Sequence, residues 1–209
     1  MHFAARFPAL QWQPSDVDEG ALGSIAAWIA ESELPNIRPP LRLDTRDDDW
    51  GIDRVDAVFS ANMVHISPWS SAIGLAKGAA RILPAGGSLI LYGPWLRDGI
   101  ATAPSNLAFD ADLKRRNPEW GLRRVEDFAA FAAENGLALA DTHLMPANNL
   151  ALHFIRNGPN FRLSLRVVAN DRAWPKAIRN RATAANSGGH PVHRCSSWRG
   201  WKAPTWRPR

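Results

Sequence analysis

Polar side chains gather where one short apolar segment of the chain ends. Residues 55–61 read Val-Asp-Ala-Val-Phe-Ser-Ala, which is typical of a strand buried on both faces of a parallel sheet. Asn62, His65 and Ser67 follow it closely. Because ligands bind at the carboxyl ends of strands in open α/β sheets, we predict a site here. The structural alternative is that Asn62 caps the next turn and His65 is a hydrogen-bonded core residue.

Two carboxylates lie at the ends of earlier strand-like segments. Asp16 ends the first segment and Asp44 ends the second. The first carboxylate could accept both ribose hydroxyls of a nucleoside cofactor, and the second, or the backbone beside it, could meet the adenine amino group. Aspartates at strand ends are also common as caps and turn formers, so spacing alone leaves both interpretations open.

The elements that must position these residues alternate between strands and helices. Hydrophobic periodicity and breaks at Pro and Gly predict strands at 10–13, 41–44, 55–61, 88–92, 137–144 and 150–155, and helices at 2–7, 17–32, 70–83, 105–116 and 124–135. We expect Ser15 or Asp16 to cap the helix at 17–32. The short join at 145–149 predicts an antiparallel hairpin. Together they indicate a doubly wound, mostly parallel α/β sheet of the kind found in class I methyltransferases.

Charge divides the chain at about residue 157. Residues 1–156 hold 14 Lys and Arg against 19 Asp and Glu, whereas residues 157–209 hold 11 Lys and Arg against one acid, Asp171. The C-terminal part is also rich in Trp, Pro, Ser and Gly, which predicts a disordered basic tail. The basic balance is therefore no sign that the folded domain at 1–156 binds nucleic acid, and such binding is expected only through the tail.

Composition excludes several other classes of protein. The single cysteine, Cys195, rules out an internal disulfide and a Cys-based metal cluster, and we predict no metal site. No apolar run reaches membrane-spanning length, and the N-terminus lacks the features of a signal peptide. We therefore expect a soluble cytoplasmic protein with no membrane partner.

Six motifs in a fixed order carry a resemblance to a known family. They are Trp12-Gln13-Pro14-Ser15-Asp16, residues 61–69, Leu91-Tyr92-Gly93-Pro94, Ser105-Asn106 with Phe109-Asp110, Trp120-Gly121-Leu122-Arg123, and Met145-Pro146-Ala147-Asn148-Asn149. Over residues 2–156 the chain resembles the methyltransferase-like 26 family, a domain-of-unknown-function group (domain 938) with the S-adenosylmethionine-dependent methyltransferase fold. The resemblance implies S-adenosylmethionine as cofactor, with Asp16 and Asp44 in the ribose and adenine roles. It also implies that Asn62 and Met63 lie beside the adenine or the sulfonium.

The chain departs from the family at its beginning. Members that it resembles start with a strand that ends in a Gly-Thr-Gly-type loop, directly before the helix that here begins at His2, and only Met1 precedes His2. We therefore expect an N-terminally truncated domain that lacks the central strand of the sheet. The loop would hold the amino-acid end of the cofactor through backbone N–H groups, so we expect impaired activity.

Other polar residues of the motifs could serve methyl transfer, in which the enzyme positions a nucleophile and, where needed, removes its proton. His65 and Asp110 are candidate proton acceptors. Candidate substrate-binding residues are Tyr92 and Asn106, which could orient a substrate, Arg123, which could bind an anion, and Asn148 and Asn149, which could close the pocket. Each also has a structural alternative as a core, packing, capping or solvated residue.

Three functions remain open at this point. The first is an S-adenosylmethionine-dependent methyltransferase that acts on a small molecule or a protein. The second is a non-catalytic binding module or truncated gene product. The third is a nucleic-acid-associated protein that works through the basic tail.

Overall fold

A computed structural model of the chain describes residues 1–158. The helices are α1 (His2–Arg6), α2 (Glu19–Ser32), α3 (Trp69–Ile82), α4 (Pro104–Arg116) and α5 (Val125–Glu134), with 3-10 turns η1 (Met63–His65) and η2 (Pro146–Asn148). The strands are β1 (Ser15–Asp16), β2 (Leu41–Arg42), β3 (Ala57–Ala61), β4 (Ser88–Gly93), β5 (Leu137–Met145) and β6 (Asn149–Arg156). The predicted basic tail lies, from residue 159 on, outside the described residues.

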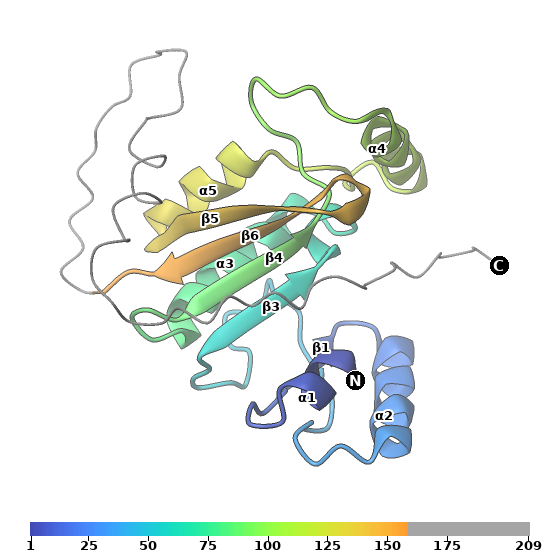
Figure 1. Cartoon of the computed structure of the whole chain (residues 1–209), viewed down its shortest axis with the longest axis vertical. Coiled ribbons are helices and arrows are strands. Elements are labelled where there is room, and N and C mark those ends of the chain that lie inside the picture. The colour runs from blue at the N-terminus through green and yellow to red at the C-terminus, as the bar shows by residue number, and fades with distance from the viewer. Residues whose placement is uncertain (159–209) are drawn as a thin grey trace, which may run out of the picture. The chain divides into compact units, whose positions relative to one another are not determined.

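The strands form two sheets in the described part of the chain. β1 and β2 pair in parallel, and a four-stranded sheet has the order β3-β4-β6-β5 (Figure 1). β3 and β4 are parallel, whereas β6 runs antiparallel to both β4 and β5. The expected α/β class and the C-terminal hairpin are therefore confirmed. β3 is an outer strand of its sheet, and no ladder within residues 1–158 joins it to β1 or β2.

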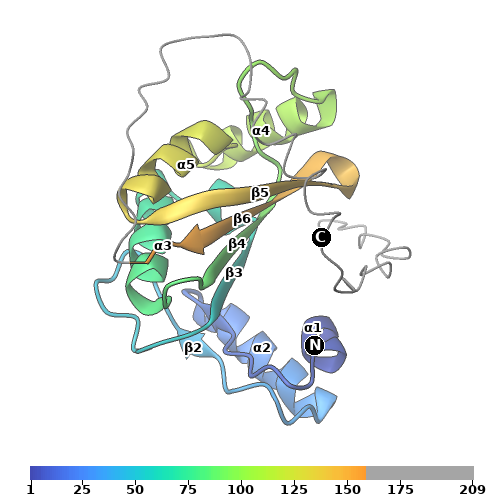
Figure 2. The ribbon, with the colours of Figure 1, turned by 60° about the vertical axis from the view of Figure 1, so that its left-hand side comes forward.

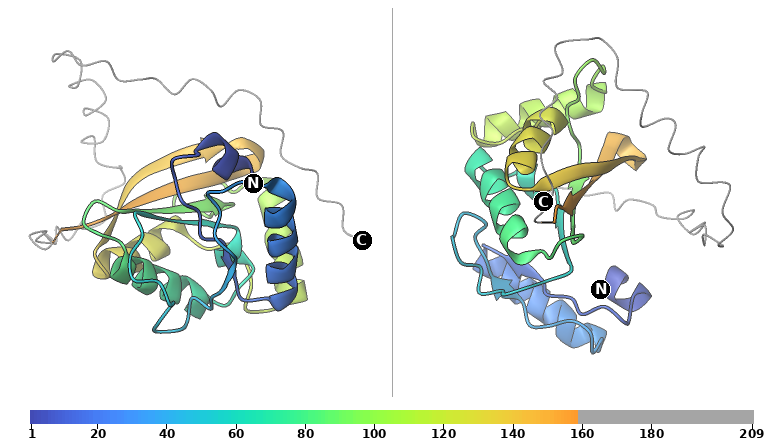
Figure 3. Two further views of the ribbon diagram at one scale, coloured as in Figure 1. Left: turned by 90° about the horizontal axis from the view of Figure 1, so that it is seen from below. Right: turned by 90° about the vertical axis from the view of Figure 1, so that its left-hand side faces the viewer.

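One face of the four-stranded sheet carries the core. Figures 2 and 3 show α3 and α5 together on this face. Their side chains pack against alternate residues of the inner strands, and Leu89, Leu152, Phe128 and Phe154 are fully buried. Along β4 every second residue is buried, as expected for a strand covered on one side. This face holds the sheet and the helices together.

Glycines in α3 allow a loop to pack tightly on the helix. A Cβ added at Gly74 would lie 2.1 Å from the Thr45 carbonyl oxygen, and one at Gly78 would lie 2.0 Å from the Trp50 ring. The Thr45 hydroxyl also donates to the Ser71 carbonyl oxygen at 2.9 Å. These contacts anchor the loop that follows β2, and with it Asp44, against α3.

The structure corrects three local expectations. The expected strand at 10–13 is shifted to Ser15–Asp16, and Trp12 makes only an isolated bridge to Ile37. The cap of α2 is Asp18, whose carboxylate accepts the Ala21 N–H at 2.7 Å, rather than Ser15 or Asp16. Burial of the segment at 55–61 on both faces is wrong, because β3 alternates between exposed and half-buried residues at the edge of its sheet.

Candidate functional site

The carboxyl ends of β3 and β4 meet at a close backbone contact. The Asn62 N–H donates to the Tyr92 carbonyl oxygen at 2.8 Å, and Asn62 has a left-handed backbone with φ of 61°. A Cβ added at Gly93 would lie 2.6 Å from His65 Nε2 and 3.0 Å from Asn62 Oδ1. Asparagine tolerates the left-handed conformation and glycine permits the close approach, so both residue types suit this junction.

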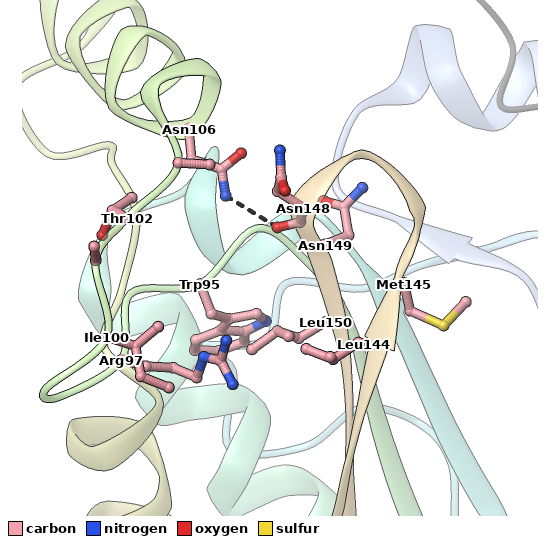
Figure 4. Close-up of a pocket in the computed structure, with 12 residues that line it drawn as sticks. Trp95, Arg97, Ile100, Thr102, Asn106, Leu144, Met145, Asn148, Asn149 and Leu150 are labelled. Carbon is pink, nitrogen blue, oxygen red and sulfur yellow. Dashed lines mark hydrogen bonds between the residues drawn. The ribbon is translucent and has the colours of Figure 1, made fainter.

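A cavity of about 210 Å³ lies between the loop that follows β4, the first turns of α4 and the turn of the β5–β6 hairpin (Figure 4). Apolar side chains make up much of its wall, with amides at one end and an arginine in the loop. The lining residues are Trp95, Arg97, Ile100, Ala101, Thr102, Ala103, Asn106, Leu144, Met145, Asn148, Asn149 and Leu150.

Three of the predicted substrate-binding residues line this cavity, and a fourth, Tyr92, is hydrogen-bonded to one of them. Asn106 is buried, and its Nδ2 donates to the Asn148 carbonyl oxygen at 3.0 Å. Asn149 Nδ2 donates to Tyr92 Oη at 3.1 Å, and Asn148 Nδ2 donates to Ser105 Oγ at 3.2 Å. The amide N–H groups thus link the hairpin to α4 and β4. The side-chain oxygens of these amides accept no hydrogen bond within residues 1–158.

His65 lies beneath this region. Its side chain is 1 % exposed, neither ring nitrogen has a hydrogen-bond partner among the described residues, and its ring meets the Trp95 ring edge-on at 5.0 Å. Burial, with a smaller contribution from the charge of Arg123, lowers the pKa of His65 to about 3. Its ring is therefore neutral at physiological pH. Its role as proton acceptor stays a prediction, and the geometry shows a packing position.

Asp110 and Arg123 hold the same region in place. The Asp110 carboxylate accepts the Leu122 N–H at 2.8 Å and pairs with Lys114 Nζ at 2.6 Å. The Arg123 guanidinium donates to the carbonyl oxygens of Val64, Ser67 and Glu119, and burial lowers its pKa. These bonds fasten the segment at 119–123 to α4 and η1. Neither residue lines the cavity, so their catalytic and anion-binding roles stay predictions.

The predicted cofactor residues lie at the carboxyl ends of β1, β2 and β3. Asp16 Oδ1 accepts the Asp18 N–H at 3.0 Å, and Oδ2 has no hydrogen bond within residues 1–158. The Asp44 carboxylate is bonded by the side chain and the N–H of Arg46, which lowers its pKa to about 2. Met63 Sδ accepts the Ser67 hydroxyl at 3.3 Å. Their roles toward a cofactor stay predictions.

Sequence reasoning missed two functional candidates and one structural residue. Trp95 and Arg97 line the cavity, and the sequence signal for them is the long connection directly after Gly93-Pro94, since long ordered loops are often functional. Asn36 is also buried, and its amide donates to the carbonyl oxygens of Ala4, Phe7 and Leu10. No pattern around Asn36 predicts these bonds.

Neither a membrane-spanning helix nor a cluster of metal-ligating side chains is found in the described part of the chain. None of its helices is both long and apolar enough to cross a bilayer. No three His, Cys, Asp or Glu side chains within residues 1–158 gather in a way that could hold a metal ion.

The fold is that of class I methyltransferases. Among solved structures, the S-adenosylmethionine-dependent methyltransferase SibL is similar with a TM-score of 0.63 and 21 % identity, over 75 % of this chain and 46 % of that protein. An O-methyltransferase family protein from Burkholderia thailandensis is similar with a TM-score of 0.63 and 17 % identity, over 75 % and 46 %. A protein from Bacillus halodurans C-125 described as a "putative methyltransferase" gives a TM-score of 0.59 and 14 % identity, over 75 % of this chain and 88 % of that protein. The chain thus spans less than half the length of the first two proteins.

The family is set by a match over residues 1–156. The chain belongs to the family described as "Protein of unknown function (DUF938)". The match covers both sheets and ends at the last residue of β6.

Proposed function

We propose that this chain is an S-adenosylmethionine-dependent methyltransferase whose acceptor binds in the cavity beside Trp95. The cofactor's adenosine end would lie along the carboxyl ends of β1, β2 and β3, and the acceptor beyond the end of β4. The methyltransferase folds of the similar structures support this proposal. The narrower assignment to methyltransferase-like 26 proteins rests on the six sequence motifs.

The observation that carries the proposal is the junction between β3 and β4. Asn62, which follows β3, bonds to Tyr92 through the backbone, and Tyr92 is the hydroxyl partner of Asn149 at the cavity. A ligand at the end of β3 would therefore be a near neighbour of a ligand in the cavity. Transfer between two molecules needs this kind of adjacency.

The residues present fit the adenosine part of the cofactor. Asp16 has an oxygen available for a ribose hydroxyl, whereas Asp44 is held by Arg46, which favours recognition of the adenine by the backbone beside Asp44. Asn62 and Met63 would border the base or the sulfonium. When bound, the cofactor would supply an electrophilic methyl group for transfer from its sulfonium to the nucleophilic atom of the acceptor.

Calorimetry with S-adenosylmethionine, together with transfer of a labelled methyl group to candidate acceptors, tests the proposal. Asp16→Ala should weaken cofactor binding by about ten- to a hundredfold, because charge-assisted hydrogen bonds contribute about 1.5–3 kcal/mol. Asp53→Ala, at an exposed aspartate outside the site, is the matched control and should change nothing. Equal binding by both variants, or no binding by the unchanged chain, would contradict the proposal.

A further inference from the structure

The loop that follows β4 places an unpaired cation in the wall of the cavity. Arg97 is half-buried there, and no acidic or carbonyl partner of its guanidinium is found in residues 1–158. The neighbouring acid, Asp98, pairs instead with Arg124, and the Asp98 N–H is held by Glu126. An unpaired guanidinium in a partly enclosed wall is suited to bind a carboxylate, because its planar N–H groups match the two carboxylate oxygens.

The other polar end of the cavity offers acceptors. The Nδ2 groups of Asn106 and Asn149 are used within the protein, and their side-chain oxygens accept no hydrogen bond from residues 1–158. Figure 4 shows the amides of Asn106 and Asn148 on one side of the Trp95 ring and the guanidinium of Arg97 on the other. A ligand that fills the cavity would therefore carry an anionic group at one end and a hydrogen-bond donor at the other.

The wall between these two ends is apolar. Trp95 is 5 % exposed, and Ile100, Leu144 and Leu150 complete the wall, with Leu144 left 75 % exposed at its rim. The volume of about 210 Å³ exceeds the roughly 150 Å³ of a cavity that takes one benzene ring. The space suits a single ring with a small substituent at each end.

The lining residues also indicate which kind of acceptor group could react in the cavity. No Asp, Glu or His is found among the lining residues within 1–158, so this part of the chain offers no carboxylate or imidazole proton acceptor in the cavity wall. A group that is nucleophilic without help from a base, or that loses its proton readily to water, suits such a site. An aromatic amine or a phenol meets this requirement better than an alkyl alcohol does.

We infer that the cavity binds a small aromatic acid, with its carboxylate on Arg97 and its hydroxyl or amino group at the carbonyl oxygens of Asn106 and Asn149. That this acid is also the methyl acceptor rests on the proposed function. Arg97 is then the residue that determines specificity for acids. The donor end of the acid lies beside Tyr92 and Asn149, on the side where β4 adjoins β3.

Binding of three probes to the full 209-residue chain tests this inference. By calorimetry, 4-hydroxybenzoate should bind at least tenfold more tightly than its methyl ester, which lacks the charge, and more tightly than benzoate, which lacks the donor. Arg97→Gln should remove the preference for the acid over the ester, and Arg97→Lys should keep part of it. Arg54→Gln, which removes the same charge from an exposed loop, should leave all three affinities unchanged.

If the unchanged chain binds the acid and the ester equally, or binds neither, the inference is overturned. This outcome does not depend on whether any variant folds. Methyl transfer separates it from the proposed function. Acid binding that depends on Arg97 without any methyl transfer would refute the function and leave the site standing. Transfer to neutral acceptors that is insensitive to Arg97→Gln would support the function and refute the site.

Discussion

Leu89 and Leu91 of β4 face α3 and α5 and are almost fully buried, whereas Ile90, between them, is only half-buried. On β3 the same open side presents Phe59, which is 45 % exposed and pairs in register with Ile90. Within residues 1–158 one face of the sheet is therefore a closed core, and the other is largely open apart from the edge-on contact of the Phe3 ring with Phe59. The comparison teaches that an apolar residue stabilises the fold only where a second layer covers it.

The largest test of this contrast is truncation of one phenylalanine on each face. Phe154→Ala, on the covered face, should lower the free energy of unfolding by about 3–5 kcal/mol, because it leaves a cavity among Phe128, Leu89 and Leu152. Phe59→Ala, its matched control on the open face, should cost about 1 kcal/mol or less, since Phe59 keeps nearly half of its surface in water. Urea unfolding measures both, and equal losses would break the comparison.

A second prediction concerns the buried, neutral ring of His65. Its pKa is about 3 in the folded chain and about 6.5 when unfolded, so between these values the unfolded state binds a proton that the folded state does not. Stability should therefore fall as the pH is lowered from about 6.5 toward 3, with His65 contributing up to about 1.4 kcal/mol per pH unit. His65→Phe should flatten this dependence.

Unfolding by urea at pH 6 and pH 4.5 checks that prediction. His153→Phe is the matched control, because His153 is half-exposed on the open side of the sheet. If His65→Phe leaves the difference in stability between the two pH values unchanged, the ring is solvated in the folded protein.

A third prediction compares a methyl group added at a packed position with one added at an open position. Gly78→Ala should destabilise the chain by about 1–3 kcal/mol, because its Cβ would overlap the Trp50 ring at 2.0 Å. Gly23→Ala, inside α2, meets no atom within 4 Å and should stabilise by about 0.5–1 kcal/mol through helix propensity. Thermal unfolding should show shifts of opposite sign. If both variants shift the melting temperature in the same direction, the loop at Trp50 moves away to make room for the added methyl group.

The smallest effect is expected at the ion pair between half-buried Asp44 and exposed Arg46. The folded pKa of Asp44, about 2, lies below its usual value of 3.8. Its stabilisation is therefore complete above pH 3.8 and is lost as the pH falls toward 2. Asp44→Asn should cost about 1 kcal/mol or less at pH 7, because the Arg46 side chain is 53 % exposed. If this loss in the free energy of unfolding vanishes in 1 M salt, the contribution of the pair is electrostatic, and a loss that persists in salt would contradict this prediction.

Local pattern predicted most of the fold. Strong periodicity located the helices α3, α4 and α5 and the hairpin within one or two residues at each end. It failed on β3, because β-branched and aromatic residues show that a segment is extended but not which strands flank it. It also located α2, predicted at 17–32, within two residues at each end, although among the described residues its apolar side chains are at most half-buried.

The candidate site was only partly predictable. Tyr92, Asn106, Asn148 and Asn149 were expected as substrate-binding residues because they belong to the motifs, and the structure links them by hydrogen bonds at or beside one cavity. Trp95 and Arg97 were missed, since an irregular loop has no period that tells which side chains turn inward. The unpartnered state of His65 was also beyond prediction, because it depends on Gly93 and Trp95 closing around the ring.

The outer edge of β3 has a consequence for how the protein behaves in concentrated solution. Residues 57–61 contain no charged residue and no Pro. Charged side chains and Pro are the features that commonly protect an edge strand such as β3 from pairing with another chain. Two copies could pair edge to edge through this segment and cover Phe59 on both. The solubility limit and the first step of heat-induced aggregation are therefore expected to be set by five residues, and Ser60→Lys or Phe59→Lys should raise the concentration at which light scattering begins.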